Sequence, residues 1–222
     1  MSESHSLCRI ISKKGIMSRK EAAKQVIAGN VSVDGIIVKN PGLVVPVSAK
    51  IEIQGEKQEA RHKIYILLNK PLKCMTTRDD PLKRRTVYDI VKEEEWVFPV
   101  GRLDYDTSGL LIMTNDSVFA EKLASPESKI PKTYVAKIKG RITDSELKQL
   151  GAKLVSTTGL STRVEITIHE GKNRQVRKML ESIGKKVVSL KRAAIGLLKD
   201  DALKTGAYRK LTVDELKLVL KK

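Results

Sequence analysis

Residues 101–116 read Gly-Arg-Leu-Asp-Tyr-Asp-Thr-Ser-Gly-Leu-Leu-Ile-Met-Thr-Asn-Asp, the densest group of chemically capable side chains in this sequence. Apolar segments at residues 96–100 and 110–114 flank its polar part, which predicts a loop over 101–109 between two strands. Such a loop can hold a reactive group rigidly and leave it open to a substrate, and Asp104 is the group we expect there. By spacing alone, a loop of this composition is more often only a turn.

Strand and helix patterns continue on both sides of this loop without strict alternation. Further strands are predicted at residues 64–68, 134–138, 162–168 and 186–190. Helices are predicted at residues 87–91, 117–124, 143–150, 174–183 and 213–220. The sequence therefore predicts an α+β domain over residues 64–222, built around a mixed, mainly antiparallel sheet.

The first 55 residues predict a separate small domain. Ser18 stands three residues before Glu21, a capping-box spacing that opens a second short helix after one that begins near Leu7. A hairpin turns at Asp34-Gly35, and residues 51–53 form a further strand. The polar segment 54–63 is interpreted as a linker. Basic side chains share the outward faces of both helices: Arg9, Lys13, Lys14, Arg19, Lys20 and Lys24.

The charge balance favours a polyanionic partner. Of the 222 residues, 43 are Lys or Arg and 26 are Asp or Glu, which gives a net charge of +17, and residues 61–222 alone carry 34 basic and 20 acidic side chains. Lys and Arg that neutralise phosphates release counterions, so nucleic acid is the expected partner. No apolar run reaches the ~20 residues of a membrane span, and no signal peptide is visible. The two cysteines, Cys8 and Cys74, indicate neither a disulfide framework nor a metal site, so a cytoplasmic location is expected.

Several segments resemble known families. Residues 17–35 resemble the alpha-L (S4-like) RNA-binding motif in its order of Ser-Arg, short helix, Gly, Val-x-Val and tight turn. Residues 101–116 resemble the signature loop of pseudouridine synthases, in particular the RsuA family, which modifies single uridines in ribosomal RNA. Elements at residues 67–77, 132–135, 170–179 and 190–196 are similar to further elements of that family and extend the resemblance over nearly the whole chain.

The resemblance implies roles for three residues. Asp104 takes the position of the essential carboxylate, which either attacks C1′ of the target uridine or removes its 2′ proton; the residues do not choose between these routes. Tyr134 takes the place of the tyrosine that lies against the base and helps to remove the C5 proton. Arg177 takes the place of the arginine that pairs with the carboxylate and favours its ionised form. The isomerisation consumes no proton overall, so no metal or redox cofactor is expected.

The expected partner is ribosomal RNA, with the large subunit slightly preferred, and the expected state is a monomer. The target base must leave its stack, and cations around the cleft offset that cost through backbone contacts. Candidate RNA-binding residues outside the first domain are Arg84, Arg85, Arg102, Lys172 and Arg174.

Two other functions remain open from the residues alone. Asp104, Asp106 and Asp116 could hold Mg²⁺ in a nuclease. Alternatively, the chain could be a ribosome assembly factor that binds ribosomal RNA and catalyses no reaction.

Overall fold

A computed structural model describes residues 4–55 and 62–221, so residues 56–61 of the predicted linker lie outside the described part. The chain divides into two compact units. The smaller contains the described residues up to Ile64 together with Glu93–Phe98 and Thr114–Ala120, and the larger contains Tyr65–Lys92, Pro99–Met113 and the residues from Glu121 onward. The division at 1–55 and 64–222 stays a prediction.

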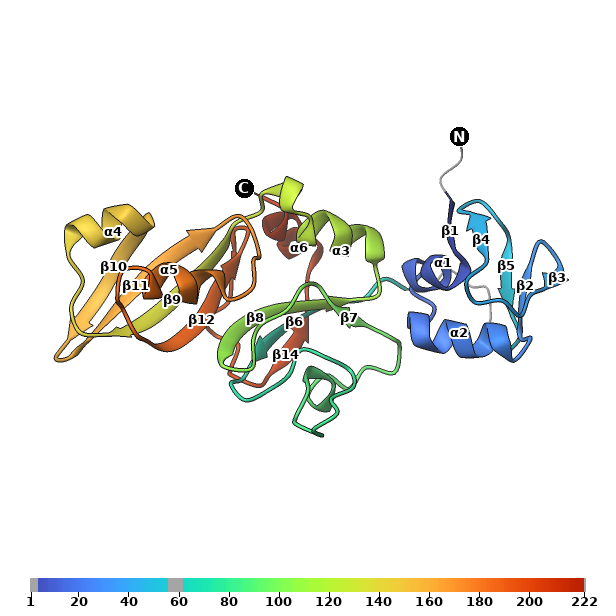
Figure 1. Cartoon of the computed structure of the whole chain (residues 1–222), viewed down its shortest axis with the longest axis horizontal. Coiled ribbons are helices and arrows are strands. Elements are labelled where there is room, and N and C mark those ends of the chain that lie inside the picture. Colours follow the sequence, from blue (N-terminus) through green and yellow to red (C-terminus); the bar gives the residue numbers. More distant parts are fainter. Residues whose placement is uncertain (1–3, 56–61, 222) are drawn as a thin grey trace. The chain divides into compact units, whose positions relative to one another are not determined.

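The smaller unit contains two short helices, α1 (Leu7–Lys13) and α2 (Arg19–Ile27) (Figure 1). The Ser18 hydroxyl accepts a hydrogen bond from the Glu21 amide at 3.1 Å, so α2 starts where the capping spacing placed it. Strands pair beside the helices: β1 (Ser4–Ser6) with β4 (Val44–Pro46), and β2 (Val31–Val33) with both β3 (Ile36–Ile37) and β5 (Ile51–Ile53). The core that holds them together is aliphatic and includes Leu7, Ile11, Ala22, Val26 and Val31.

The larger unit is organised on one mixed sheet, whose main path has the order β10-β11-β9-β12-β8-β6-β14. The bounds are β6 (Tyr65–Lys70), β8 (Thr107–Thr114), β9 (Lys132–Lys139), β10 (Ala152–Thr158), β11 (Ser161–Ile168), β12 (Val187–Ile195) and β14 (Tyr208–Lys210). Two short strands lie off this path: β13 (Leu198–Lys199) pairs with β12, and β7 (Phe98–Pro99) with β8. β12 and β8 run parallel, whereas β9 pairs antiparallel with both β11 and β12. The expected α+β class with a mixed, mainly antiparallel sheet is confirmed.

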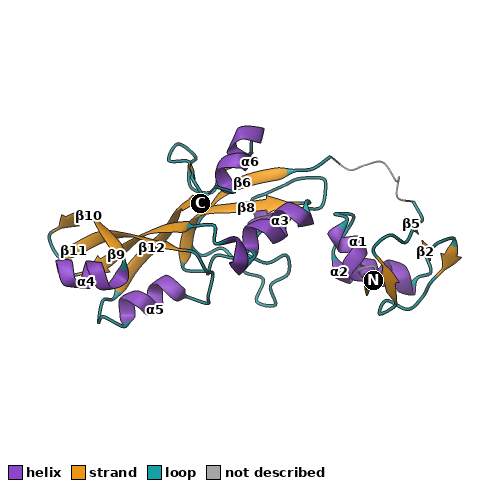
Figure 2. Ribbon diagram, turned by 90° about the horizontal axis from the view of Figure 1, so that it is seen from above, coloured by secondary structure: helices purple, strands orange, loops and turns teal. Residues whose placement is uncertain are grey.

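The helices of this unit are α4 (Asp144–Leu150), α5 (Gln175–Glu181) and α6 (Val213–Val219), with single 3₁₀ turns at Val87–Asp89 and Pro126–Ser128. Helix α3 (Ser117–Ala124) divides between the two units after Ala120. Figure 2 shows α4 and α5 on one side of the strands β9, β11 and β12. There Leu147, Leu150, Val176 and Leu180 pack with the apolar residues of these strands, which positions α5 beside the end of β12. Among the described residues, none of the helices is both long and apolar enough to cross a bilayer.

The sequence predictions for this unit differ from the structure at several elements. The predicted helix at residues 87–91 is a 3₁₀ turn, Val87–Asp89, closed by reciprocal hydrogen bonds between Thr86 and Asp89. Strand β10 carried no sequence signal because it is an edge strand on which no residue is fully buried, so it lacks the alternation of apolar and polar residues that marks a half-buried strand.

Strand β8 begins at Thr107, three residues before the predicted start. Gly109, which was expected to be the last residue of the loop, instead pairs within the strand. Gly109 pairs with Arg192 of β12 in the parallel register and has φ of +108°. A Cβ on Gly109 would lie 2.2 Å from the Arg192 carbonyl oxygen and 2.6 Å from its nitrogen, both backbone atoms. The residue must therefore be glycine for β8 and β12 to approach this closely.

We expect Gly109→Ala to lower the free energy of unfolding by about 3 kcal/mol or more, because backbone strain and a backbone clash add together. Thermal unfolding followed by circular dichroism should show a Tm lower by roughly 6–12 °C. Gly140→Ala is the matched control, since Gly140 has φ of +82° but no atom within 4 Å of the position that a Cβ would take. Equal losses in the two variants would contradict the close-approach explanation.

Candidate functional site

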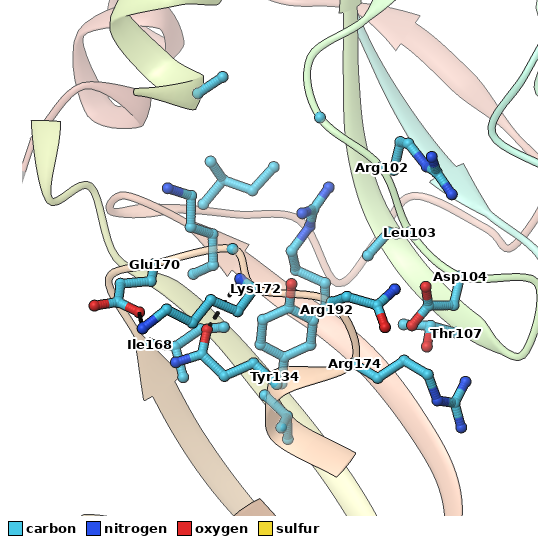
Figure 3. A pocket seen from close by; sticks show the side chains of 18 of the residues that line it. Arg102, Leu103, Asp104, Thr107, Tyr134, Ile168, Glu170, Lys172, Arg174 and Arg192 are labelled. Carbon is cyan, nitrogen blue, oxygen red and sulfur yellow. Dashed lines mark hydrogen bonds and ion pairs between the residues drawn. The ribbon is translucent and has the colours of Figure 1, made fainter. Parts of the chain in front are cut away.

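The larger unit contains a pocket of about 430 Å³, a volume that suits one nucleotide. Its wall is formed by the loop before β8, the facing strands β9 and β12, and the segment that leads into α5. Asp104, Tyr134 and Arg192 line it, and Figure 3 shows their side chains around the same hollow. The structure therefore brings Asp104 and Tyr134 together, two of the three residues expected to carry the chemistry.

The loop that carries Asp104 is fastened at every carbonyl from residue 103 to residue 107. The donors are Thr76 Oγ1 to Leu103 at 2.8 Å, Thr107 N to Asp104 at 3.0 Å, Lys73 N to Tyr105 at 2.8 Å, Arg177 Nη2 to Asp106 at 2.7 Å and Lys70 Nζ to Thr107 at 2.9 Å. Five satisfied acceptors in succession leave the loop little freedom, so the position of the Asp104 carboxylate is set by the fold before any substrate binds.

Lys70 is a buried cation under this loop. Its side chain has no solvent exposure, and Nζ donates to the carbonyl oxygens of Pro71 at 3.0 Å and Thr107 at 2.9 Å. Burial lowers the pKa of Lys70, while the charges of Cys74, Asp104 and Asp106 oppose that shift. The negative charges of the two aspartates thus favour the protonated form of Lys70.

Arg177 is placed differently from the expectation. Its Nη2 lies 3.1 Å from Asp106 Oδ2 and donates to the Asp106 carbonyl, and Arg174 Nη1 lies 3.2 Å from both carboxylate oxygens of Asp106. The pairing of Arg177 with Asp104 was wrong: the loop turns back between Asp104 and Thr107, which brings Asp106 to the start of α5. Within residues 4–55 and 62–221, no ion pair is formed by the Asp104 carboxylate.

Arg192 also lines the pocket, but it was not among the residues expected there. It lies within residues 190–196, one of the segments that resemble a known family. It is 6% exposed, lines the pocket, and donates from Nε to the Leu110 carbonyl at 2.6 Å. In the register of β9 and β12 it stands directly opposite Tyr134. An arginine at an inward position of a strand was the available signal, because charged residues are rarely buried without a purpose.

The expected RNA-binding cations of this unit fall into two groups. Arg102, Lys172 and Arg174 line the pocket and are exposed, and Lys172 pairs with Glu170 at 2.7 Å. Arg85 is exposed on the segment between β6 and β7.

Arg84 lies on the same segment, but its side chain is held by two neighbouring residues. It binds Asp80 at 2.7 Å and its guanidinium lies 5.6 Å from the centre of the Tyr105 ring. The Arg84 hydrogen bonds lower the pKa of Asp80 to about 2. Arg84 is thus fixed next to the residue that follows Asp104, and its charge is already shared with an acid.

The six expected cations of the smaller unit lie on α1 and α2 or beside them. Lys14, Arg19, Lys20 and Lys24 are exposed, whereas Arg9 and Lys13 are partly buried. The exposed members form a surface that is suited to a phosphate backbone.

Two of the three carboxylates proposed for a metal-dependent nuclease, Asp106 and Asp116, are engaged in other contacts. Asp106 is held by Arg174 and Arg177, while Asp116 accepts the Val118 and Phe119 amides at the start of α3 and pairs with Lys63 at 2.8 Å. In the described part of the chain, no three His, Cys, Asp or Glu side chains gather as metal ligands would. These contacts speak against the nuclease alternative.

Comparison with known proteins adds independent findings. The family model described as RNA pseudouridylate synthase matches residues 64–182, and the model of the S4 domain matches residues 7–51. Ribosomal large subunit pseudouridine synthase B of Bacillus subtilis is 40% identical over 95% of this chain and 93% of its own length. An uncharacterized RNA pseudouridine synthase of Aquifex aeolicus is 37% identical over 96% and 92%. A crystal structure of a pseudouridylate synthase superposes with a TM-score of 0.66 at 27% identity, covering 97% of this chain and 99% of that one.

Proposed function

Since the chain belongs to the RNA pseudouridine synthase family, we propose that it isomerises a uridine of large-subunit ribosomal RNA with Asp104 as the catalytic carboxylate. The observation that carries the proposal is the fastened loop, which holds Asp104 in a nucleotide-sized pocket that Tyr134 also lines. The large-subunit target rests on the name of the Bacillus subtilis relative, which matches this chain over almost its whole length.

In the proposed reaction, the target uridine is extruded into the pocket and its ring lies on Tyr134. The Asp104 carboxylate, below the sugar, either attacks C1′ or takes the 2′ proton, and the N1–C1′ bond breaks. The freed uracil turns and rejoins C1′ through C5. The Tyr134 hydroxyl then helps to remove the C5 proton. Extrusion of the base costs a few kcal/mol, which contacts of Arg102 and Arg174 with the RNA backbone offset.

Arg177 acts on this reaction through Asp106. It fixes both the carbonyl and the carboxylate of Asp106, two residues from Asp104, and so it is a positioning residue. We propose that Lys70, whose buried Nζ donates to the Thr107 carbonyl of the same loop, supplies positive charge near Asp104 instead.

The substrate class supports a location in the cytoplasm, where ribosomal RNA is assembled.

The direct test is to map pseudouridines in ribosomal RNA from cells with and without the gene, by carbodiimide-dependent stops of reverse transcription. We expect one large-subunit stop to disappear in the deletion strain and to return when the wild-type gene is restored. An unchanged pattern in both subunits would overturn the proposal, and a stop lost from the small subunit would correct its target.

The S4 domain is proposed to grip the RNA through the cations of α2. Replacing both Arg19 and Lys24 with Gln should reduce the slope of log affinity against log salt by about 1.5, because each lost phosphate contact contributes roughly 0.7–0.9. The matched control replaces Lys39 and Lys50 with Gln, which removes the same charge from loops of the same unit; Lys50 already pairs with Glu52 at 2.8 Å. Filter binding at several salt concentrations measures both slopes. Equal slopes for the two variants would count against a contact through α2.

A further inference from the structure

The guanidinium of Arg192 is buried but only partly used. Its Nε donates to the Leu110 carbonyl, whereas Nη2 has no hydrogen-bond partner among the described residues. Only 6% of the residue is exposed, so Nη2 is withdrawn from water without compensation. An unsatisfied donor of this kind costs about 1–3 kcal/mol, and more when it is charged. Such a cost is typical of a site that a ligand completes.

The wall around Arg192 carries excess positive charge. Lys132 also lines the pocket, and its pKa is lowered by burial and by the charge of Arg192. Glu170, an acid of the same wall, is already paired with Lys172 at 2.7 Å. Two cations that repel each other in a shielded wall favour a ligand that carries or develops negative charge.

The position of Arg192 indicates which part of a nucleotide it meets. Residues directly opposite each other in an antiparallel pair have Cβ atoms about 4.5–5.5 Å apart, and Arg192 is opposite Tyr134. The register shifts immediately after Arg192, a bulge that fixes the direction of its side chain. Figure 3 shows the Arg192 side chain next to the Tyr134 ring in the hollow. A pyrimidine stacked on Tyr134 would therefore present its edge to Arg192.

We propose that Arg192 is a catalytic residue that hydrogen-bonds the uracil carbonyl oxygens and stabilises the uracil anion formed when the glycosidic bond breaks. The proposal rests on the function proposed above. When the N1–C1′ bond breaks, its electron pair leaves with uracil, and the negative charge spreads over N1 and the carbonyl oxygens. C1′ is left bonded to the Asp104 carboxylate, or doubly bonded to C2′ after Asp104 has taken the 2′ proton. When the pair returns from C5 to form the new C5–C1′ bond, either the Asp104–C1′ bond breaks and frees the carboxylate, or C2′ takes back its proton from Asp104.

This assignment separates Arg192 from the cations that would contact phosphate. Arg102 and Arg174 are exposed at the pocket, as backbone-binding arginines are expected to be, whereas Arg192 lies in the buried wall. A fixed guanidinium in a shielded site stabilises developing charge strongly because it needs no reorganisation during the reaction. Arg192 should therefore affect the rate of bond cleavage more than the affinity for RNA.

The test compares Arg192→Gln with the wild type under single-turnover conditions, on an RNA that carries either uridine or 5-fluorouridine at the target. Fluorine withdraws electrons, so fluorouracil is the better leaving group and needs less stabilisation. We expect Arg192→Gln to react about 100-fold more slowly with uridine, the usual effect of removing one such donor, but only about tenfold more slowly with fluorouridine. Chromatography of the digested RNA measures the unreacted nucleoside.

Two further variants control for misfolding and for a general loss of positive charge. Arg192→Lys keeps a cation that can donate to the Leu110 carbonyl, so this variant should preserve the fold. Its rate should still fall more with uridine than with fluorouridine. Lys191→Gln removes the neighbouring charge on the opposite face of β12 and should react with both substrates as the wild type does.

Equal losses on the two substrates, in either Arg192 variant, would overturn the proposal in favour of a structural role. Weaker RNA binding with an unchanged saturating rate would overturn it in favour of a phosphate contact. A wild-type protein that forms no pseudouridine would instead overturn the proposed function itself.

Discussion

Asp104→Asn should reduce pseudouridine formation by at least about 10³-fold, because the amide can neither attack C1′ nor accept the 2′ proton. The substitution keeps the size of the side chain and leaves all five carbonyl anchors of the loop in place. The affinity for RNA should therefore stay within about twofold of the wild type, since contacts to the RNA backbone supply most of the binding free energy. Rates on a ribosomal RNA fragment and filter binding measure the two quantities.

Asp201→Asn is the matched control, since Asp201 is exposed and contributes to no wall of the pocket. It should react at the wild-type rate. Substantial turnover by Asp104→Asn would remove the carboxylate from the mechanism. Loss of both rate and RNA affinity in that variant would show that Asp104 serves binding, as the assembly-factor alternative requires.

Arg177→Ala should lower the rate by about 100-fold, the effect expected when a reacting group is misplaced by about 1 Å. Without the guanidinium, the Asp106 carbonyl loses its partner and the Asp106 carboxylate keeps only Arg174, which is 40% exposed and screened by water. The loop then relaxes, and Asp104 moves with it. Lys178→Ala, which changes an exposed cation one residue further along α5, should have little effect.

The pH dependence of the rate separates positioning from a direct charge effect. If Arg177 acts through Asp106, the acid limb of the pH–rate profile keeps its position in Arg177→Ala while the whole profile falls. If Arg177 served chiefly to keep Asp104 ionised, its loss would move that limb to higher pH, because the carboxylate would bind its proton more readily. A shift of the acid limb to higher pH would therefore support a direct pairing of Arg177 with Asp104.

The elements with strong local signals were predicted well from the sequence. Helix α3 has the predicted bounds, and α2 and α4 start at their capping residues, Ser18 and Thr143. Strand β5 also has the predicted bounds. These features depend on side-chain to backbone bonds within a few residues, or on apolar periodicity, and both are visible in a linear sequence.

The features that depend on distant partners were missed or misassigned. β14 has three polar residues and exists only because its backbone pairs with β6. The motifs predict Asp104 and Tyr134 as site residues, and both line the pocket. Which of the two aspartates Arg177 contacts could not be predicted, because it depends on how the loop turns and on where α5 begins. Lys70 and Arg192 gain their roles from burial, which no neighbouring residue in the sequence reveals.

The anchoring of residues 103–107 has a consequence for the newly made protein. Lys70, Lys73 and Thr76 leave the ribosome before the loop does, whereas Arg177 follows Asp106 by 71 residues. At translation speeds of roughly 5–20 residues per second, the last anchor emerges about 4–14 s after the residue that it holds. A nascent chain that ends before α5 should therefore display the aspartate without the geometry for catalysis, and activity should appear only after both this helix and the later strand β12, which carries Arg192, have docked.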